Sequence, residues 1–91
     1  MIKNGKNYVK CEIAKGMYGV TKYVMIRDKG NKGDIVAAGF FPKELLKKNK
    51  LRVKVRVIKK NQALISVDKD SGGRFLSGLK VWAPKKLIVS R

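Results

Sequence analysis

The sequence contains no histidine, and Cys11 is the single cysteine among its 91 residues. Histidine is the usual general base near neutral pH and the most frequent metal ligand in proteins. One cysteine allows neither an intramolecular disulfide nor a multi-cysteine zinc site. We therefore expect no enzymatic activity, no metal and no cofactor. We expect Cys11 to be a small core residue, and the absence of disulfides suits a reducing compartment such as the cytoplasm.

Long apolar segments are also absent. The longest uninterrupted one runs from Ile35 to Ala38, whereas a membrane-spanning helix needs about 20 apolar residues. The start of the chain, MIKNGKNYVK, is basic but lacks the apolar core of a secretory signal. The one helical candidate, residues 43–50, is too short to anchor the chain to a membrane surface. We therefore predict a cytoplasmic protein with no membrane partner.

Acidic residues are scarce, with 6 Asp and Glu against 23 Lys and Arg, which gives a formal net charge of +17. The hydrophobic fraction of 44% is nevertheless high enough for a folded core. Solubility alone needs a net charge of only roughly 2–8 in a small domain. The excess indicates a polyanionic partner. Lysine outnumbers arginine by 18 to 5, which favours contact with phosphates over reading of base edges.

Apolar and polar residues alternate with the period of two that is typical of β-strands. We predict strands at residues 8–14, 20–27, 34–41, 51–57, 63–68, 74–82 and 87–89, and one short helix near 43–49 that follows Pro42. Short strands at this spacing predict a mainly β fold. The expected architecture is a single domain over residues 1–91, a small barrel of five to seven short antiparallel strands. A five-stranded oligonucleotide-binding barrel is the nearest alternative.

The strand at 51–57 has the clearest alternation. Leu51, Val53, Val55 and Val57 are expected to face the core, and the cations between them are expected to face outward. Among the aromatic residues, we expect Phe75, Trp82 and one of Phe40 and Phe41 in the core. Tyr18 stands in a glycine-bounded turn and is the best candidate for an exposed ring that stacks on a base.

The turn Lys29-Gly30-Asn31-Lys32-Gly33-Asp34-Ile35-Val36 lies between two apolar strands. It resembles the core of the KOW motif in the matching residues Ile26, Lys29, Gly30, Gly33, Ile35 and Val36. The resemblance implies an SH3-like small barrel and a role in transcription or translation. Asp28 and Asp34 depart from the basic character of that loop in the family. The alternative is a tight hairpin turn in which the glycines serve the backbone alone.

The C-terminal part also resembles an SH3-like barrel. There we expect a 3₁₀ turn at residues 83–86 before a short last strand.

The candidate binding residues are basic and fall into two clusters. The first is Arg52, Lys54, Arg56, Lys59 and Lys60, with Arg74 and Lys80 expected nearby, and the second is Lys43, Lys47, Lys48 and Lys50. Such a stripe can follow a phosphate backbone. The sequence thus predicts a nucleic-acid-binding protein that contacts duplex DNA or structured RNA with little sequence specificity. The alternative is a phage or mobile-element accessory protein that docks on an acidic surface of host RNA polymerase or the ribosome.

Overall fold

The computed structural model describes residues 7–14, 19, 21–28 and 34–90. Their secondary structure consists of short strands and single 3₁₀ turns. The strands are β1 (Asn7–Lys10), β2 (Glu12–Ile13), β3 (Thr21–Asp28), β4 (Asp34–Pro42), β5 (Lys50–Lys59), β6 (Gln62–Ser66), β7 (Arg74–Phe75), β8 (Lys80–Pro84) and β9 (Ile88–Ser90). The 3₁₀ turns are η2 (Lys43–Leu45), η3 (Lys69–Ser71) and η4 (Lys85–Leu87). The prediction of a mainly β fold is confirmed.

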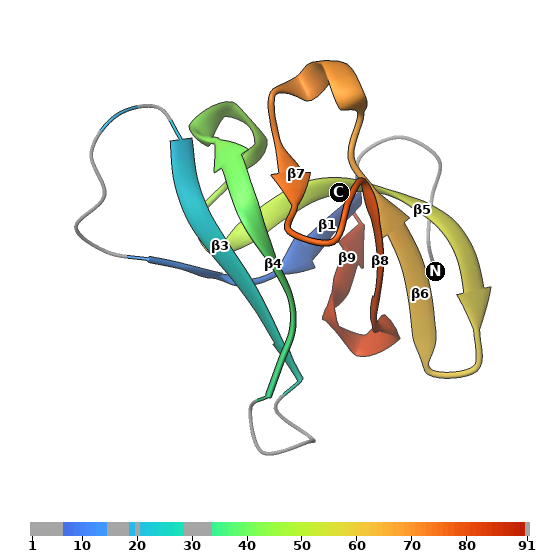
Figure 1. Ribbon diagram of the computed structural model, residues 1–91. Helices are drawn as coiled ribbons and strands as arrows, with labels where there is room; N and C mark the ends of the chain where they lie inside the picture. The colour runs from blue at the N-terminus through green and yellow to red at the C-terminus, as the bar shows by residue number, and fades with distance from the viewer. Residues whose placement is uncertain (1–6, 15–18, 20, 29–33, 91) are drawn as a thin grey trace.

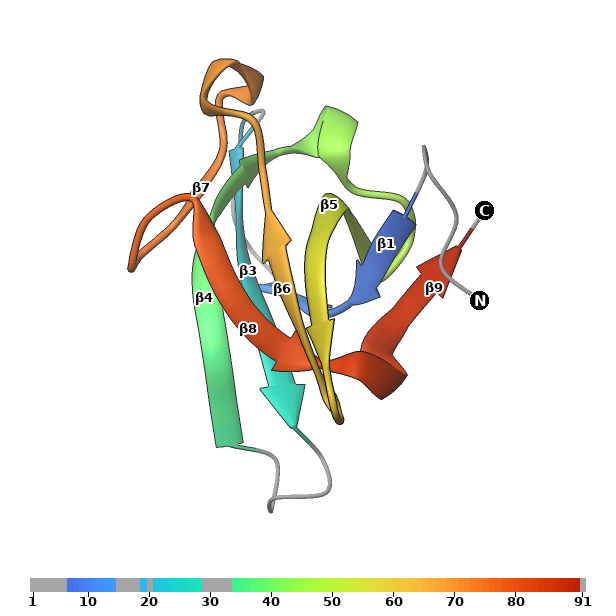
Figure 2. The same cartoon turned by 90° about the vertical axis from the view of Figure 1, so that its right-hand side faces the viewer.

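The strands of the described residues form two antiparallel sheets. One has five strands in the order β8-β6-β5-β1-β9, and the other has four in the order β2-β3-β4-β7. Figure 1 shows the β3–β4 hairpin on one side of the molecule and β5, β6 and β8 on the other, and this second side faces the viewer in Figure 2. The long strand β5 connects the two parts of the five-stranded sheet. Its first half pairs with β1 and its second half pairs with β6.

Each of the seven predicted strands has a counterpart in the structure. The one predicted at 8–14 is divided at Cys11 into β1 and β2, and the one at 74–82 is divided into β7 and β8. The second division lies near Gly78, whose φ of 133° is strained for any residue with a Cβ atom. The helix predicted near 43–49 is the single 3₁₀ turn η2, and the 3₁₀ turn expected before the last strand is η4.

The core lies between the two sheets and takes side chains from both. Phe41 of β4 and Phe75 of β7 are fully buried, with ring centroids 5.0 Å apart in an edge-to-face arrangement. Val9 and Leu51 reach the same cluster from the five-stranded sheet. Cys11 is buried with them, as predicted.

A β-bulge in β5 overturns one expectation. Val55 pairs with Ile65, but Val57 pairs with Leu64, so Arg56 is an extra residue in the ladder. One extra residue moves every later side chain to the opposite face. Val57 is therefore 47% exposed, and the prediction that it faces the core is wrong.

The prediction of a core position for Trp82 is also wrong. Its neighbours Val81 and Ala83 are buried, and strand alternation places Trp82 on the outer face, where it is 45% exposed. Of the two adjacent phenylalanines, Phe41 is in the core and Phe40 is 44% exposed. The structure also contains, in the part of the chain that it describes, no helix with the length and hydropathy needed to cross a membrane.

Candidate functional site

Cations gather on the outer face of the sheet formed by β5, β6 and β8. Lys54, Ser66 and Lys80 are opposite one another on the three neighbouring strands, so their side chains share one face. We call this surface the basic sheet face. It consists of Arg52, Lys54, Arg56, Ser66, Asp68 and Lys80.

The β-bulge places Arg56 over Ser66. Arg56 Nε donates a hydrogen bond to Ser66 Oγ across 3.0 Å. Ser66 is only 2% exposed although it lies on the outer face. The contact holds the guanidinium against the sheet between Lys54 and Lys80, and the rest of the guanidinium keeps donors for a ligand.

Asp68 is the acidic residue of this face. Its carboxylate forms an ion pair with Lys54, with 2.9 Å between Lys54 Nζ and Asp68 Oδ1. The hydrogen bond and the charge of Lys54 lower the pKa of Asp68, and the charges of Arg56 and Arg52 lower it further. Three cations therefore surround one exposed carboxylate. A cleft of about 240 Å³ lies beside this group and is lined by residues that include Arg52, Lys54 and Ser71.

Most of the cations that the structure describes on this side have no acidic partner among the described residues. Among the described residues, no carboxylate lies within ion-pair distance of Arg52, Lys59, Lys60 or Lys80. Lys59 and Lys60 stand at the tip of the β5–β6 hairpin. Lys60 has a φ of 56°, a conformation that glycine or asparagine adopts more easily.

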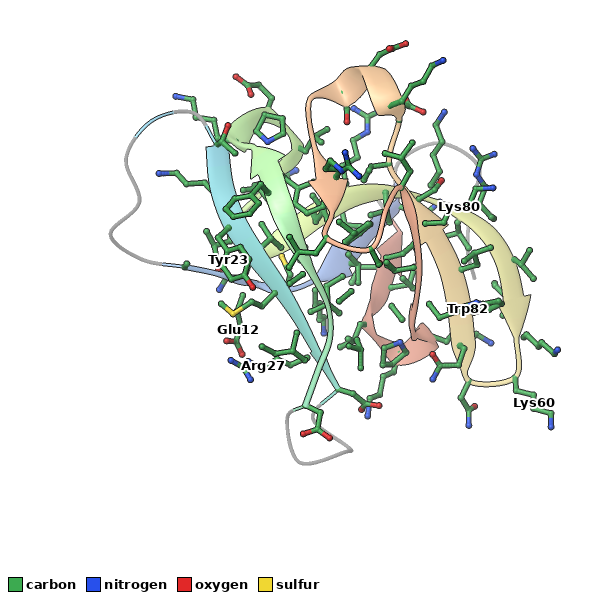
Figure 3. All side chains as sticks on the ribbon, viewed as in Figure 1. Glu12, Tyr23, Arg27, Lys60, Lys80 and Trp82 are labelled. Carbon is green, nitrogen blue, oxygen red and sulfur yellow. The ribbon has the colours of Figure 1, made fainter. Side chains whose placement is uncertain are left out.

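An apolar row separates the basic sheet face from this hairpin tip. Val57, Leu64 and Trp82 are opposite one another on β5, β6 and β8. Val57 and Trp82 are exposed, and Leu64 is half-buried. In Figure 3, Trp82 lies between Lys80 and Lys60 along this side of the molecule. An exposed indole is thus flanked by cations in both directions along the sheet.

The structure does not bring Arg74 to this face. Arg74 is in β7 of the four-stranded sheet, opposite Phe40, which in turn is opposite Tyr23. The Tyr23 and Phe40 rings are 5.1 Å apart between centroids. Figure 3 shows Tyr23 on the other side of the molecule from Trp82, together with the ion pair of Arg27 and Glu12.

The second predicted cluster lies in the connection from β4 to β5. Lys43, Lys47 and Lys48 are exposed there. Lys48 lines a cleft of about 500 Å³ together with Lys10, Lys50, Arg27 and Glu12. Lys10 and Lys50 are directly opposite each other on β1 and β5, an arrangement in which like charges repel. This cleft has no lining residue in common with the one beside Asp68.

Cys11 also lines the larger cleft. Its burial, aided by the charge of Glu12, raises the pKa of the thiol to about 12. The thiol therefore stays protonated at neutral pH and is a poor nucleophile. The described residues contain no cluster of three or more Cys, Asp or Glu side chains that could hold a metal ion.

Four predicted positions lie outside the described residues: Tyr18, and the lysine and glycines of the KOW-like turn (Lys29, Gly30 and Gly33). The flanking parts of that turn, Ile26, Ile35 and Val36, are in β3 and β4 as expected.

The apolar row was not predicted from the sequence. One signal for it was present, because Val57 and Ile58 are two consecutive apolar residues that break the alternation and so mark a bulge. A second signal was the apolar residue on each side of Trp82. Val81 and Ala83 are two residues apart in the strand, so they share one face, and two apolar residues on one face indicate that it is the inner face. Comparison of the chain with protein-family models, with curated proteins and with solved structures gives no match.

Proposed function

We propose that this protein binds nucleic acid by contacting the phosphate backbone with its basic sheet face, with little sequence specificity. The observation that carries the proposal is the concentration of cations on one ordered sheet, with Asp68 as the acid among them. Arg52, Arg56 and Lys80 leave donors for phosphate oxygens, and lysines at the hairpin tip extend the same charge. Contacts of this kind position a protein on nucleic acid without reading the bases.

The architecture supports the same proposal. The antiparallel neighbours β5, β6 and β8 and the 3₁₀ turn η4 before β9 support the SH3-like barrel that the KOW resemblance implies. On that basis the biological setting is transcription or translation in the cytoplasm. The basic sheet face carries the proposal independently of the KOW-like turn.

A salt titration of the nuclease-treated protein tests the proposal. Labelled duplex DNA, single-stranded DNA and a structured RNA are each titrated, and anisotropy gives the dissociation constant. With about 4–6 phosphate contacts, log K should fall against log salt with a slope of about −4 to −5 on duplex DNA. Failure to bind any of the three at low salt would overturn the proposal. Docking on an acidic protein surface would then be the remaining candidate.

A further inference from the structure

We infer that the basic sheet face, if it binds nucleic acid as proposed above, takes single strands, and that Trp82 is the residue on which a base stacks. The inference rests on the proposed function and adds the strand class of the ligand. It follows from the place of Trp82 in the apolar row.

Trp82 and its neighbours in the apolar row form an exposed apolar patch. Trp82 is 45% exposed in an ordered strand. Beside it in the row, Val57 is 47% exposed and Leu64 is half-buried. Such a patch is stabilised by an apolar partner surface. A duplex hides the faces of its bases within the stack and offers phosphates and groove edges. A single strand offers free base faces, which stack on aromatic side chains.

Cations lie on both sides of the apolar row. Alternate residues of a strand are about 7 Å apart. Lys80 stands two residues before Trp82 on β8, at about this distance, and the Arg56 guanidinium lies on Ser66, which is opposite Lys80. On the other side of the row, Lys59, Gln62 and Pro84 are opposite one another, so Lys59 lies beyond the row on β5. A backbone that crosses the row meets cations before and after the indole. This is the combination of basic groove and stacking platform that single-strand binding uses.

The second exposed aromatic provides a contrast. Phe40 is 44% exposed, but it packs against Tyr23 and lies in the other sheet. Its exposure nearly equals that of Trp82, and Tyr23 and Arg74 are opposite it on the two neighbouring strands. The pairs two residues away along the ladder on either side, Thr21–Pro42 and Met25–Ala38, carry no charge, so cations do not flank this ring in both directions. Phe40 is therefore a matched control for the loss of an exposed ring.

Trp82 is the only tryptophan in the chain, so its fluorescence reports directly on this site. The protein is titrated at low salt with a 20-nucleotide oligothymidine, a 20-base-pair duplex and an RNA hairpin. We expect the oligothymidine to quench the tryptophan emission and to bind more tightly than the duplex. Trp82→Ala should weaken oligothymidine binding by about tenfold, and Trp82→Phe should retain most of the affinity because a ring remains. Phe40→Ala should leave it unchanged.

Three outcomes would overturn the inference. Binding of the oligothymidine without quenching, or equal losses on duplex and single strand in Trp82→Ala, would leave the proposed backbone contact intact and remove the stacking role. A dimer of the free protein by sedimentation, dissociated by both Trp82 variants, would assign the row to a protein interface instead. Absence of binding to all three ligands is the separate result that defeats the proposed function itself. Circular dichroism of each variant confirms folding.

Discussion

The hydrogen bond from Arg56 to Ser66, 3.0 Å long, joins the extra residue of the β5 bulge to the centre of the neighbouring strand. The bulge has two consequences for the outer face of the sheet. It lays a guanidinium across Ser66, between Lys54 and Lys80. It also turns Val57 outward, where it meets Leu64 and Trp82. Both the position of the Arg56 guanidinium and the exposure of Val57 on this face thus depend on one inserted residue.

The first prediction concerns the cations of β5. Replacing Arg52, Lys54 and Arg56 together by glutamine should weaken nucleic-acid binding on the order of 100-fold at 0.1 M salt, and make the salt slope shallower by about 2–3, because three phosphate contacts are lost. The loss should be similar for unrelated sequences, since backbone contacts carry no sequence information. Salt titrations of the variant and the parent protein measure both quantities.

The matched control removes the same number of charges elsewhere. Lys43, Lys47 and Lys48 are all exposed in the β4–β5 connection, and their replacement by glutamine should change the slope by less than about 1. An equal loss in the two triple variants would show that affinity follows net charge alone and that no particular face binds.

The second prediction concerns Asp68, which holds Lys54 in an exposed ion pair. Asp68→Asn should tighten nucleic-acid binding at pH 7 by about twofold. In the variant, Lys54 can contact a phosphate without first giving up its ion pair with the Asp68 carboxylate. The lowered pKa of Asp68 also makes the stability of the folded state depend on pH. The carboxylate favours the folded state above its ordinary pKa of about 4 and loses that effect as the pH falls through the lowered value.

The pH dependence provides the check on Asp68. The thermal midpoints of parent and Asp68→Asn proteins should differ slightly at pH 6 and converge as the pH falls below the pKa of Asp68. The difference should be small because the pair is exposed to solvent. Weaker binding by Asp68→Asn would contradict a competition between this carboxylate and phosphate.

The fold was largely predictable because strand formation here follows local alternation. In β5, Leu51 and Val53 alternate with Arg52 and Lys54, and both apolar residues are buried. The positions of the strands therefore followed from the sequence. The bulge did not, because it depends on how β5 and β6 pair, and a single inserted residue reverses the inner and outer sets beyond it.

The candidate site was predictable in part for a related reason. Arg52 and Lys54 share a face through their spacing alone, which any strand would give them. Whether Lys80 or Arg74 joins them depends on which strands become neighbours. β8 pairs with β6, and β7 pairs with β4 in the other sheet. The pairing of the strands depends on long-range packing in the core, which the local sequence pattern does not indicate.

The third prediction concerns Cys11. With a pKa of about 12, about one thiol in 10⁴ is ionised at pH 8, so the folded protein should react very slowly with a disulfide reagent such as DTNB. Unfolding in urea should restore the rate of a free cysteine. Fast reaction of the native protein at pH 8 would contradict the burial of Cys11 between the sheets. The same measurement across urea concentrations also reports the opening of the core.

The last prediction concerns the close approach of β4 and β7. A Cβ atom at Gly39 would collide with the main chain of β7, at the carbonyl oxygen of Arg74 and the Cα of Phe75. Because both atoms belong to the backbone, no rotamer change relieves the contact. Gly39→Ala should therefore lower the free energy of unfolding by about 1–3 kcal/mol, measured as a lower urea midpoint.

The neighbouring exposed Ser77 supplies the control for Gly39, and Ser77→Ala should stay within about 0.5 kcal/mol of the parent protein. An unchanged midpoint in Gly39→Ala would show that β7 does not pack this closely. The basic sheet face lies in the five-stranded sheet, and Gly39 lies in the other. At temperatures where Gly39→Ala is still folded, its nucleic-acid affinity should therefore equal that of the parent. A parallel loss of affinity would instead mean that β7 and Arg74 belong to the binding surface.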